Sequence, residues 1–208
     1  MKCKPCILIF FLISALNAFL QAPDYSKIKI IHSVKCAPVE DQQYSSTCWS
    51  FASASFIESE IYRKQGLFYD LSEMYFSRYS YINKISAYLK ADGNIYFTPG
   101  GQFHDVLEVI KIWGVVPEES YNGDPFSTHY YNYSMLDTLV WQYTRSLLQL
   151  HRKKPTAHDW KVYNNLFDTY MGKVADNFEY NGKTYSPKSF VSNALELNPD
   201  DYIEITSY

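Results

Sequence analysis

The most informative stretch of this 208-residue sequence is Gln42-Gln43-Tyr44-Ser45-Ser46-Thr47-Cys48-Trp49-Ser50-Phe51-Ala52. It places a cysteine at the start of an apolar helical segment, with a glutamine six positions before it. A thiol attacks carbonyl carbons when it is ionised, and the unpaired N–H groups and dipole at a helix N-terminus favour the thiolate. The backbone N–H of Cys48 and the side-chain amide of Gln42 are candidate donors to the oxyanion that such an attack creates. We therefore predict that Cys48 and Gln42 are catalytic residues.

A structural cysteine buried beside a core tryptophan is the alternative interpretation of Cys48. The neighbouring residues favour the catalytic one. The glutamine, the run Ser-Thr-Cys-Trp-Ser-Phe-Ala and the helix that follows resemble the papain-like cysteine peptidases. Ser45 stands where many members of that family carry a disulfide cysteine, so the resemblance is to the branch of bleomycin hydrolases and aminopeptidase C.

Other segments resemble the same branch, namely Leu71-Ser72-Glu73, Gly100-Gly101-Gln102, Trp113-Gly114-Val115-Val116-Pro117 and Asn198-Pro199-Asp200-Asp201-Tyr202. The resemblance covers about residues 36–125 and 184–208, and a helical insertion at about 135–177 lies between them. It implies that Gly100, Gly101 and Trp49 bind substrate, because glycines let an extended peptide approach the main chain closely. A simple turn is the alternative for the two glycines.

The implied fold class is α+β and papain-like, comprising mainly the helical half with the start of the β-rich half, and incomplete at the C-terminus. The sequence pattern predicts helices at about 48–65, 72–89, 102–113, 135–153 and 158–177. It also predicts a hairpin around Asn181-Gly182, a short helix within 187–197 and a strand at 201–208.

The catalytic base is the missing part of this interpretation. Papain-like catalysis pairs the cysteine with a histidine that an Asn or Asp orients, both far downstream. None of the histidines has the sequence context of that family (His32, His104, His129, His151, His158), and Asn-Ser-Trp-Gly is absent. We therefore expect these 208 residues alone to be poorly stable and catalytically weak or inactive. The alternative is a non-catalytic binding or structural module derived from a papain-like peptidase.

Residues 1–22 have the pattern of a secretory signal peptide: Lys2 and Lys4, then an apolar run, then small residues. The run is too short to cross a bilayer comfortably, so an uncleaved anchor is the less favoured alternative. We therefore expect an exported protein, periplasmic or extracellular, whose peptidase domain occupies residues 23–208.

Composition limits the partners. Aromatic residues make up 18% of the chain, which argues against disorder, and no Lys/Arg run predicts a nucleic-acid partner. The cysteines and histidines show no metal-ligand spacing, so we expect no metal and no cofactor. A Cys36–Cys48 disulfide would abolish the nucleophile, and Cys36 is instead expected to pack as a small apolar residue. The expected partners are a peptide substrate and either a second copy of the chain or the missing C-terminal half.

Overall fold

The structure, a computed structural model, describes residues 28–205. The predicted signal peptide, residues 1–22, lies outside the described residues. The chain divides into two units, residues 1–34 and residues 35–208. Residues 28–34 of the first unit contain no helix or strand, so every described helix and strand belongs to the second unit.

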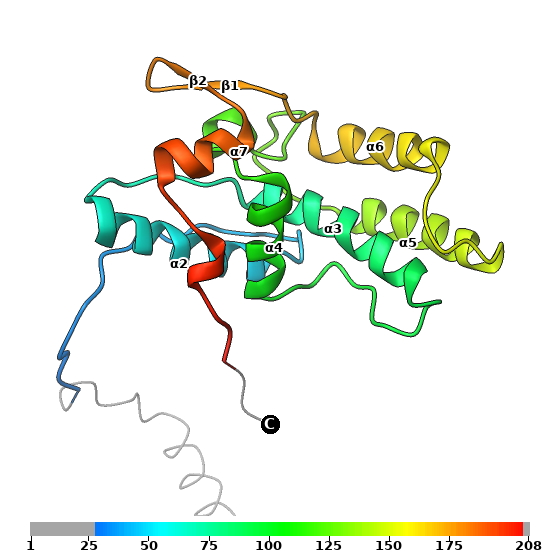
Figure 1. Cartoon of the computed structure of the whole chain (residues 1–208), viewed down its shortest axis with the longest axis horizontal. Coiled ribbons are helices and arrows are strands. Elements are labelled where there is room, and N and C mark those ends of the chain that lie inside the picture. Colours follow the sequence, from blue (N-terminus) through cyan, green and yellow to red (C-terminus); the bar gives the residue numbers. More distant parts are fainter. Residues whose placement is uncertain (1–27, 206–208) are drawn as a thin grey trace, which may run out of the picture. The chain divides into compact units, whose positions relative to one another are not determined.

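The second unit is helical apart from one hairpin (Figure 1). Its elements in chain order are α2 (Cys48–Gln65), α3 (Glu73–Lys90), α4 (Phe103–Trp113), η2 (Glu118–Ser120), α5 (Ser134–Gln149), α6 (Ala157–Met171), β1 (Phe178–Tyr180), β2 (Lys183–Tyr185), α7 (Pro187–Phe190), η3 (Val191–Leu195) and η4 (Pro199–Asp201). β1 and β2 pair antiparallel, with Phe178 opposite Tyr185. The predicted α+β class is confirmed, with helices predominant.

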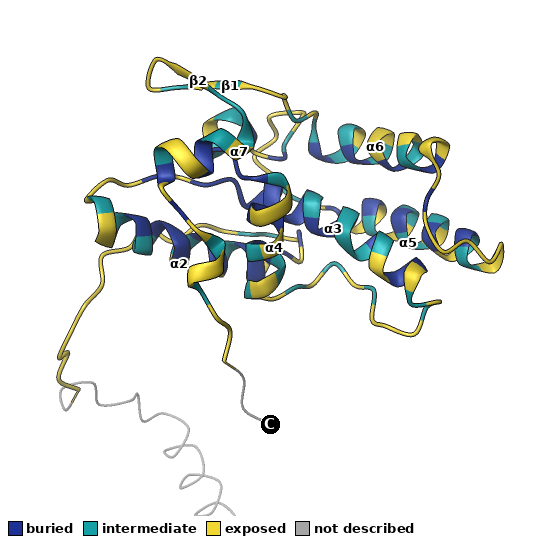
Figure 2. Ribbon diagram, in the orientation of Figure 1, coloured by how far each residue is buried: buried dark blue, intermediate teal, exposed yellow. Residues whose placement is uncertain are grey.

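The core lies where α2, α3 and α4 pack against one another. The inward faces of α2 and α4 are buried and their opposite faces are exposed, whereas the first half of α3 is buried nearly all round (Figure 2). Ile57 of α2, Phe76 of α3 and Val109 of α4 have no measurable exposure, and burying one such side chain stabilises a fold by roughly 1.5–3 kcal/mol. Helices α5 and α6 pack on each other and on α3. The segment predicted as a helical insertion therefore adds to this core and does not form a separate unit.

Local signals fix the ends of the three central helices. Helix α2 stops at Gly66, which adopts the left-handed conformation (φ 71°) and donates its N–H to the Tyr62 carbonyl at 2.7 Å. Helix α3 starts after Ser72, whose Oγ accepts a hydrogen bond from the Tyr75 N–H. Helix α4 starts with a capping box formed by Gln102 and Asp105. All three helices lie within one residue of their predicted bounds.

Later elements differ from the predictions in several places. Helix α5 ends at Gln149 rather than at 153, and α6 ends at Met171 rather than at 177 because Gly172 follows with φ 77°. The short helix predicted within 187–197 consists of α7 and a single π-helical turn, η3. The predicted hairpin is confirmed, and Asn181 and Gly182 both have positive φ as a tight turn of this kind requires.

The strand predicted at 201–208 is wrong within the described residues. Residues 199–201 form the 3-10 turn η4, and residues 202–205 pair with no described strand. Ile203 and Ile205 are 80% and 86% exposed, because no second strand lies beside them to bury their side chains. Residues 206–208 lie outside the described part. No helix of residues 28–205 combines the length and apolar content that a membrane span needs.

Candidate active site

Cys48 is the first residue of α2, and its side chain is exposed. The first N–H groups of a helix have no partner within the helix, and they point toward whatever lies at its N-terminus. The N–H groups of Ser50 and Phe51 bond back to the Thr47 carbonyl, at 2.8 and 3.2 Å. Within residues 28–205 the Cys48 N–H has no acceptor, so it is free to donate to an oxyanion beside the thiol.

The turn that carries Gln42 leads directly into α2. The Ser45 N–H and the Ser45 hydroxyl both donate to the Gln42 carbonyl, at 3.2 and 2.6 Å. Ser45 also shares a short hydrogen bond with the Thr47 hydroxyl. The Gln42 Oε1 atom is buried without a hydrogen-bond partner, and no described hydrogen bond joins Gln42 to Cys48. The structure thus holds the two predicted catalytic residues on one compact turn, and their roles stay predictions.

Gln43 ties this turn to a distant loop. Its Nε2 donates to the His129 carbonyl at 2.9 Å, and its Oε1 accepts from the Tyr131 N–H at 2.6 Å. The Tyr44 N–H adds a third bond, to the Tyr131 carbonyl at 3.1 Å. Gln43 has φ 52°, a left-handed conformation that is uncommon for residues other than glycine and that these bonds hold in place.

Replacing Gln43 by alanine is expected to lower the free energy of unfolding by about 1–2 kcal/mol, because two hydrogen bonds are lost while the backbone strain remains. Urea unfolding followed by circular dichroism measures the change. Gln142→Ala is the matched control, since Gln142 is exposed on α5 and makes no side-chain hydrogen bond within the described part. Equal stabilities of the two variants would show that the two side-chain hydrogen bonds of Gln43, the Gln43 clamp, contribute nothing to stability.

Trp49 joins the nucleophile helix to the Gly100–Gly101 segment. Its indole Nε1 donates to the Pro99 carbonyl at 3.1 Å, and the side chain is largely buried. A Cβ atom on Gly101 would lie 2.7 Å from the Trp49 ring and 2.9 Å from Asp105 Oδ2, too close for any residue but glycine without a shift. Trp49, which follows Cys48 in the sequence, therefore contacts the Pro99–Gly101 segment. The predicted role of Trp49, Gly100 and Gly101 in substrate binding stays a prediction.

No histidine of residues 35–208 forms a hydrogen bond with Cys48 within the described part. His104 lies exposed on α4, and its Nδ1 is 2.6 Å from Glu204 Oε2. His129 lies in the loop that Gln43 binds, and His151 and His158 lie near the turn between α5 and α6. The candidate site therefore contains an exposed thiol and a free backbone N–H, and no histidine of the described part is bonded to that thiol.

The prediction that Cys36 is packed is wrong. It was expected to pack as a small apolar residue, but its side chain is exposed, because residues 35–41 run over the surface without joining a helix or strand. Both Cys36 and Cys48 carry free thiols. Any test of Cys48 chemistry therefore needs a Cys36 control.

No protein-family profile matches the chain. The chain is similar to "Cysteine proteinase 1, mitochondrial" of Saccharomyces cerevisiae, for example in strains YJM789 and ATCC 204508 / S288c. The two sequences are 27% identical over 126 residues, which cover 52% of this chain and 26% of the yeast protein. The chain resembles a cysteine proteinase. It aligns with about a quarter of the length of the curated relatives that it matches.

This similarity confirms the resemblance to bleomycin-hydrolase-like cysteine peptidases that the Cys48 segment predicted. The chain is therefore peptidase-like in kind. The predominantly helical α+β structure is consistent with the N-terminal portion of a papain-like fold.

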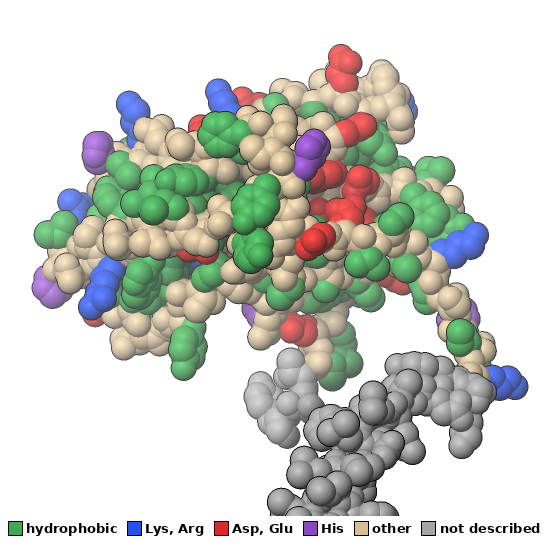
Figure 3. All heavy atoms as spheres, turned by 180° about the vertical axis from the view of Figure 1, so that it is seen from behind, with side chains coloured by type: hydrophobic (Ala, Val, Ile, Leu, Met, Phe, Trp, Pro, Cys, Tyr) green, Lys and Arg blue, Asp and Glu red, His purple; other side chains and the backbone are tan. Residues whose placement is uncertain are grey.

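Carboxyl groups of α2, α3 and η2 form a second group of titratable side chains. Glu58 on α2 and Glu73 on α3 are buried, and the Glu58 carboxylate accepts a hydrogen bond from the Leu71 N–H at 2.8 Å. Glu118 of η2 has one carboxylate oxygen, Oε2, that is buried without a partner. Acidic side chains also gather on the face shown in Figure 3. Within the described residues no Lys, Arg or His lies in ion-pair distance of these three carboxyl groups.

Burial raises the pKa of all three groups, and neighbouring carboxylates raise it further. The pKa reaches about 7 for Glu58, about 8 for Glu118 and about 9 for Glu73, compared with an ordinary value of 4.5. Burial also raises the pKa of Glu40 and of Asp70, each beside another acidic residue. The Glu73 carboxyl therefore keeps its proton at neutral pH.

No group of three or more His, Cys, Asp and Glu side chains within residues 28–205 has the arrangement of a metal site. Since a metal ion would need several such ligands at one point, the carboxyl cluster is best described as a set of largely protonated acids.

Sequence reasoning missed two side chains that hold the site together, Gln43 and Lys84. Gln43 directly follows the predicted oxyanion donor, but its partners are more than 80 residues away in sequence. Lys84 lies on α3 three residues after Tyr81 and four before Tyr88, both buried. The sequence signal that could have identified Lys84 is its spacing from Tyr81 and Tyr88, which places a charged side chain on a face of the helix that is expected to be buried.

Proposed function

We propose that this protein is a cysteine-type peptidase, of aminopeptidase or bleomycin-hydrolase type, that attacks peptide carbonyls through the Cys48 thiolate. The observation that carries the proposal is the exposed thiol of the first residue of α2, which precedes Trp49, the residue against which Gly101 packs. The similarity to the yeast cysteine proteinase supports the same chemistry.

The proposed reaction begins when Cys48 Sγ bonds to the carbonyl carbon of the substrate and the carbonyl oxygen takes the negative charge. The free Cys48 N–H and the Gln42 side-chain amide would donate to that oxygen, and one such donor lowers the barrier by roughly 3 kcal/mol. When the C–N bond breaks, the amine leaves with a proton and an acyl thioester remains on Cys48. Water then hydrolyses the thioester and restores the thiol.

The departing amine needs a proton donor, and the hydrolytic water needs a base. We propose that the histidine and asparagine for these steps lie outside the described residues, in a further segment of the protein or in a partner chain. The support is that no histidine of residues 35–208 bonds to Cys48 within the described part, while the exposed side of Cys48 is open to a partner. The described residues would then capture a substrate-like electrophile faster than they turn over substrate.

The test uses a peptidyl epoxide, which traps a thiol after the peptide part has bound. The purified protein is incubated with the reagent, and the modified residue is located by peptide mass mapping. We expect one adduct, on Cys48, and slow hydrolysis of aminoacyl and peptidyl fluorogenic substrates. An adduct on Cys36 alone, or none, would contradict the peptidase proposal. Fast turnover would contradict only the proposed location of the base.

A non-catalytic binding or structural module is the second candidate, and the lack of a described histidine beside Cys48 favours it. The two candidates differ in one measurement. A module would bind a peptide aldehyde and the corresponding alcohol equally well, because neither forms a bond to the protein. A peptidase site would hold the aldehyde more tightly, since the aldehyde forms a hemithioacetal with Cys48.

We also propose that the protein is exported, on the strength of the signal-like pattern of residues 1–22. The yeast relative carries "mitochondrial" in its name, which refers to that protein. N-terminal sequencing of the mature protein from its native cells separates the two locations. A new N-terminus near residue 22 in an exported fraction supports the proposal, and an intact N-terminus in another compartment contradicts it.

A further inference from the structure

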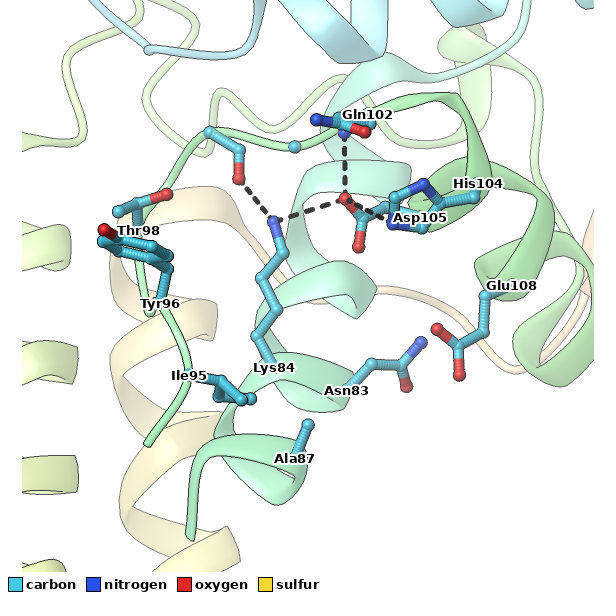
Figure 4. A pocket seen from close by; sticks show the side chains of 12 residues that line it. Asn83, Lys84, Ala87, Ile95, Tyr96, Thr98, Gln102, His104, Asp105 and Glu108 are labelled. Atoms are coloured by element: carbon cyan, nitrogen blue, oxygen red, sulfur yellow. Dashed lines mark hydrogen bonds and ion pairs between the residues drawn. The ribbon is translucent and has the colours of Figure 1, made fainter. Parts of the chain in front are cut away.

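Lys84 reaches from the middle of α3 into the candidate site. Its Nζ donates to the Gly100 carbonyl at 2.5 Å, as Figure 4 shows. The same Nζ lies 3.8 Å from Asp105 Oδ2 and 4.9 Å from the centroid of the Trp49 ring. The Lys84 side chain is only 18% exposed, so these contacts replace most of the water around the ammonium group.

The surroundings of this lysine explain why it stays in place. Burial lowers the pKa of Lys84, while Asp105 opposes that change. A buried ammonium is unfavourable unless it is paired and hydrogen-bonded, and here the carboxylate, the carbonyl and the aromatic face supply those partners. A hydrogen bond from a charged donor is roughly twice as strong as one between neutral groups. Lys84 therefore holds the Gly100 carbonyl in one direction.

The direction of that carbonyl decides where the next N–H points. The peptide bond is planar, and no described residue has a cis bond, so the Gly100 C=O and the Gly101 N–H point in opposite directions. The C=O points to Lys84, and the Gly101 N–H therefore points away from it. Within residues 28–205 the Gly101 N–H has no acceptor, so it remains available to a ligand.

A pocket of about 480 Å³ lies on the Lys84 side of the segment, lined by residues that include Asn83, Thr98, Gln102 and Glu108 (Figure 4). Without the ammonium group, the Gly100 carbonyl would face this open space. Two consecutive glycines rotate freely because neither has a Cβ atom. The backbone alone would not hold the orientation.

We propose that Lys84 is a positioning residue that fixes the Gly100–Gly101 peptide so that the Gly101 N–H faces an extended peptide substrate. The inference rests on the proposed peptidase function and deepens it. Lys84 itself touches neither the thiol nor the substrate. It acts through the main chain, where the Gly101 N–H would donate a hydrogen bond to an extended ligand as a strand edge does.

The test compares two reagents on the purified full-length protein. Iodoacetamide reacts with the Cys48 thiol without any pairing to the main chain, whereas a peptidyl epoxide requires that pairing. Lys84→Met keeps the length and apolar stem of the side chain and removes the donor. We expect the second-order rate constant for the peptidyl epoxide to fall about tenfold to a hundredfold, as for loss of one charge-assisted hydrogen bond. The rate constant for iodoacetamide at Cys48 is expected to stay unchanged.

Two further variants complete the design. Lys90→Met is the matched control, because Lys90 is an exposed lysine at the end of the same helix, and it should change neither rate. Lys84→Arg keeps a charged donor and should restore part of the peptidyl rate, which a role in packing alone would not predict. If circular dichroism shows that Lys84→Met does not fold, Lys84→Gln carries the same comparison.

An unchanged peptidyl rate in Lys84→Met, or an equal fall with both reagents, would overturn the positioning role while leaving the peptidase proposal intact. The peptidase proposal has its own readout in the unsubstituted protein. If the peptidyl epoxide reacts there no faster than an epoxide without a peptide part, both the proposed function and this inference fail. A selective fall with the peptidyl reagent alone is the result that supports Lys84.

Discussion

Replacing Cys48 by alanine is expected to abolish covalent capture of a peptidyl epoxide and to reduce any peptide hydrolysis by about 10⁴-fold or more. The sulfur is the atom that forms the bond to the substrate carbon, and removing the nucleophile of a hydrolase typically has an effect of this size or larger. The thiol is exposed at the start of α2, so alanine leaves no cavity and the fold should persist. Mass mapping and fluorogenic substrates measure the two effects.

The control for this variant is Cys36→Ala. Cys36 is the other thiol of the described part and is also exposed. The Cys36→Ala substitution therefore removes an exposed sulfur that lies outside the candidate site. Capture and hydrolysis should match those of the unsubstituted protein. Activity that survives in Cys48→Ala would mean that another group attacks the substrate, and the catalytic interpretation of the turn would be wrong.

The stability of the protein is expected to fall as the pH rises from about 4.5 to about 9. In this interval Glu58, Glu73 and Glu118 keep protons that the unfolded chain releases, since burial raises each pKa from 4.5 to about 7, about 9 and about 8. The stabilisation is fully present at a pH below the pKa of the unfolded state, and it is lost as the pH rises through the pKa of the folded state. Each such proton contributes a slope of about 1.4 kcal/mol per pH unit. Urea unfolding at a series of pH values measures the total slope.

Glu73→Gln tests the cause of this slope. Glutamine resembles the protonated carboxyl and cannot titrate, so the variant should match the unsubstituted protein near pH 4 and be more stable at pH 8. Glu60→Gln is the control, because the hydrogen bond from Arg63 lowers the pKa of Glu60 rather than raising it. Parallel pH curves for the unsubstituted protein and Glu73→Gln would show that the buried carboxyl is not protonated.

The ends of the central helices could be predicted from sequence because their signals are local. Gly66 stops α2 and Ser72 caps α3 within a few residues of the helices they limit. The Asn181-Gly182 hairpin likewise needs no information from outside its own turn. The position of Cys48 at the first turn of α2 followed from the same kind of evidence.

Contacts between distant segments could not be predicted in this way. The partners of Gln43 lie in a loop more than 80 residues away in the sequence, and no local pattern brings the two segments together. The role of Lys84 depends on the position of the Gly100 carbonyl, and the raised pKa of Glu73 depends first on its burial by the tertiary packing. The predicted C-terminal strand failed for a related reason, since alternation of residues shows a preference for extended structure but cannot supply a neighbouring strand.

The clamp formed by Gln43 has a consequence for how this protein can be altered. Gln43 recognises the loop only through main-chain atoms, the His129 carbonyl and the Tyr131 N–H. The side chains of the loop are therefore left free to diversify while its backbone path is preserved, apart from Ser127 and His129, whose φ of 52° favours asparagine or glycine as replacements. A library of substitutions at residues 126–130 would vary the surface next to the nucleophile turn without loosening the turn itself.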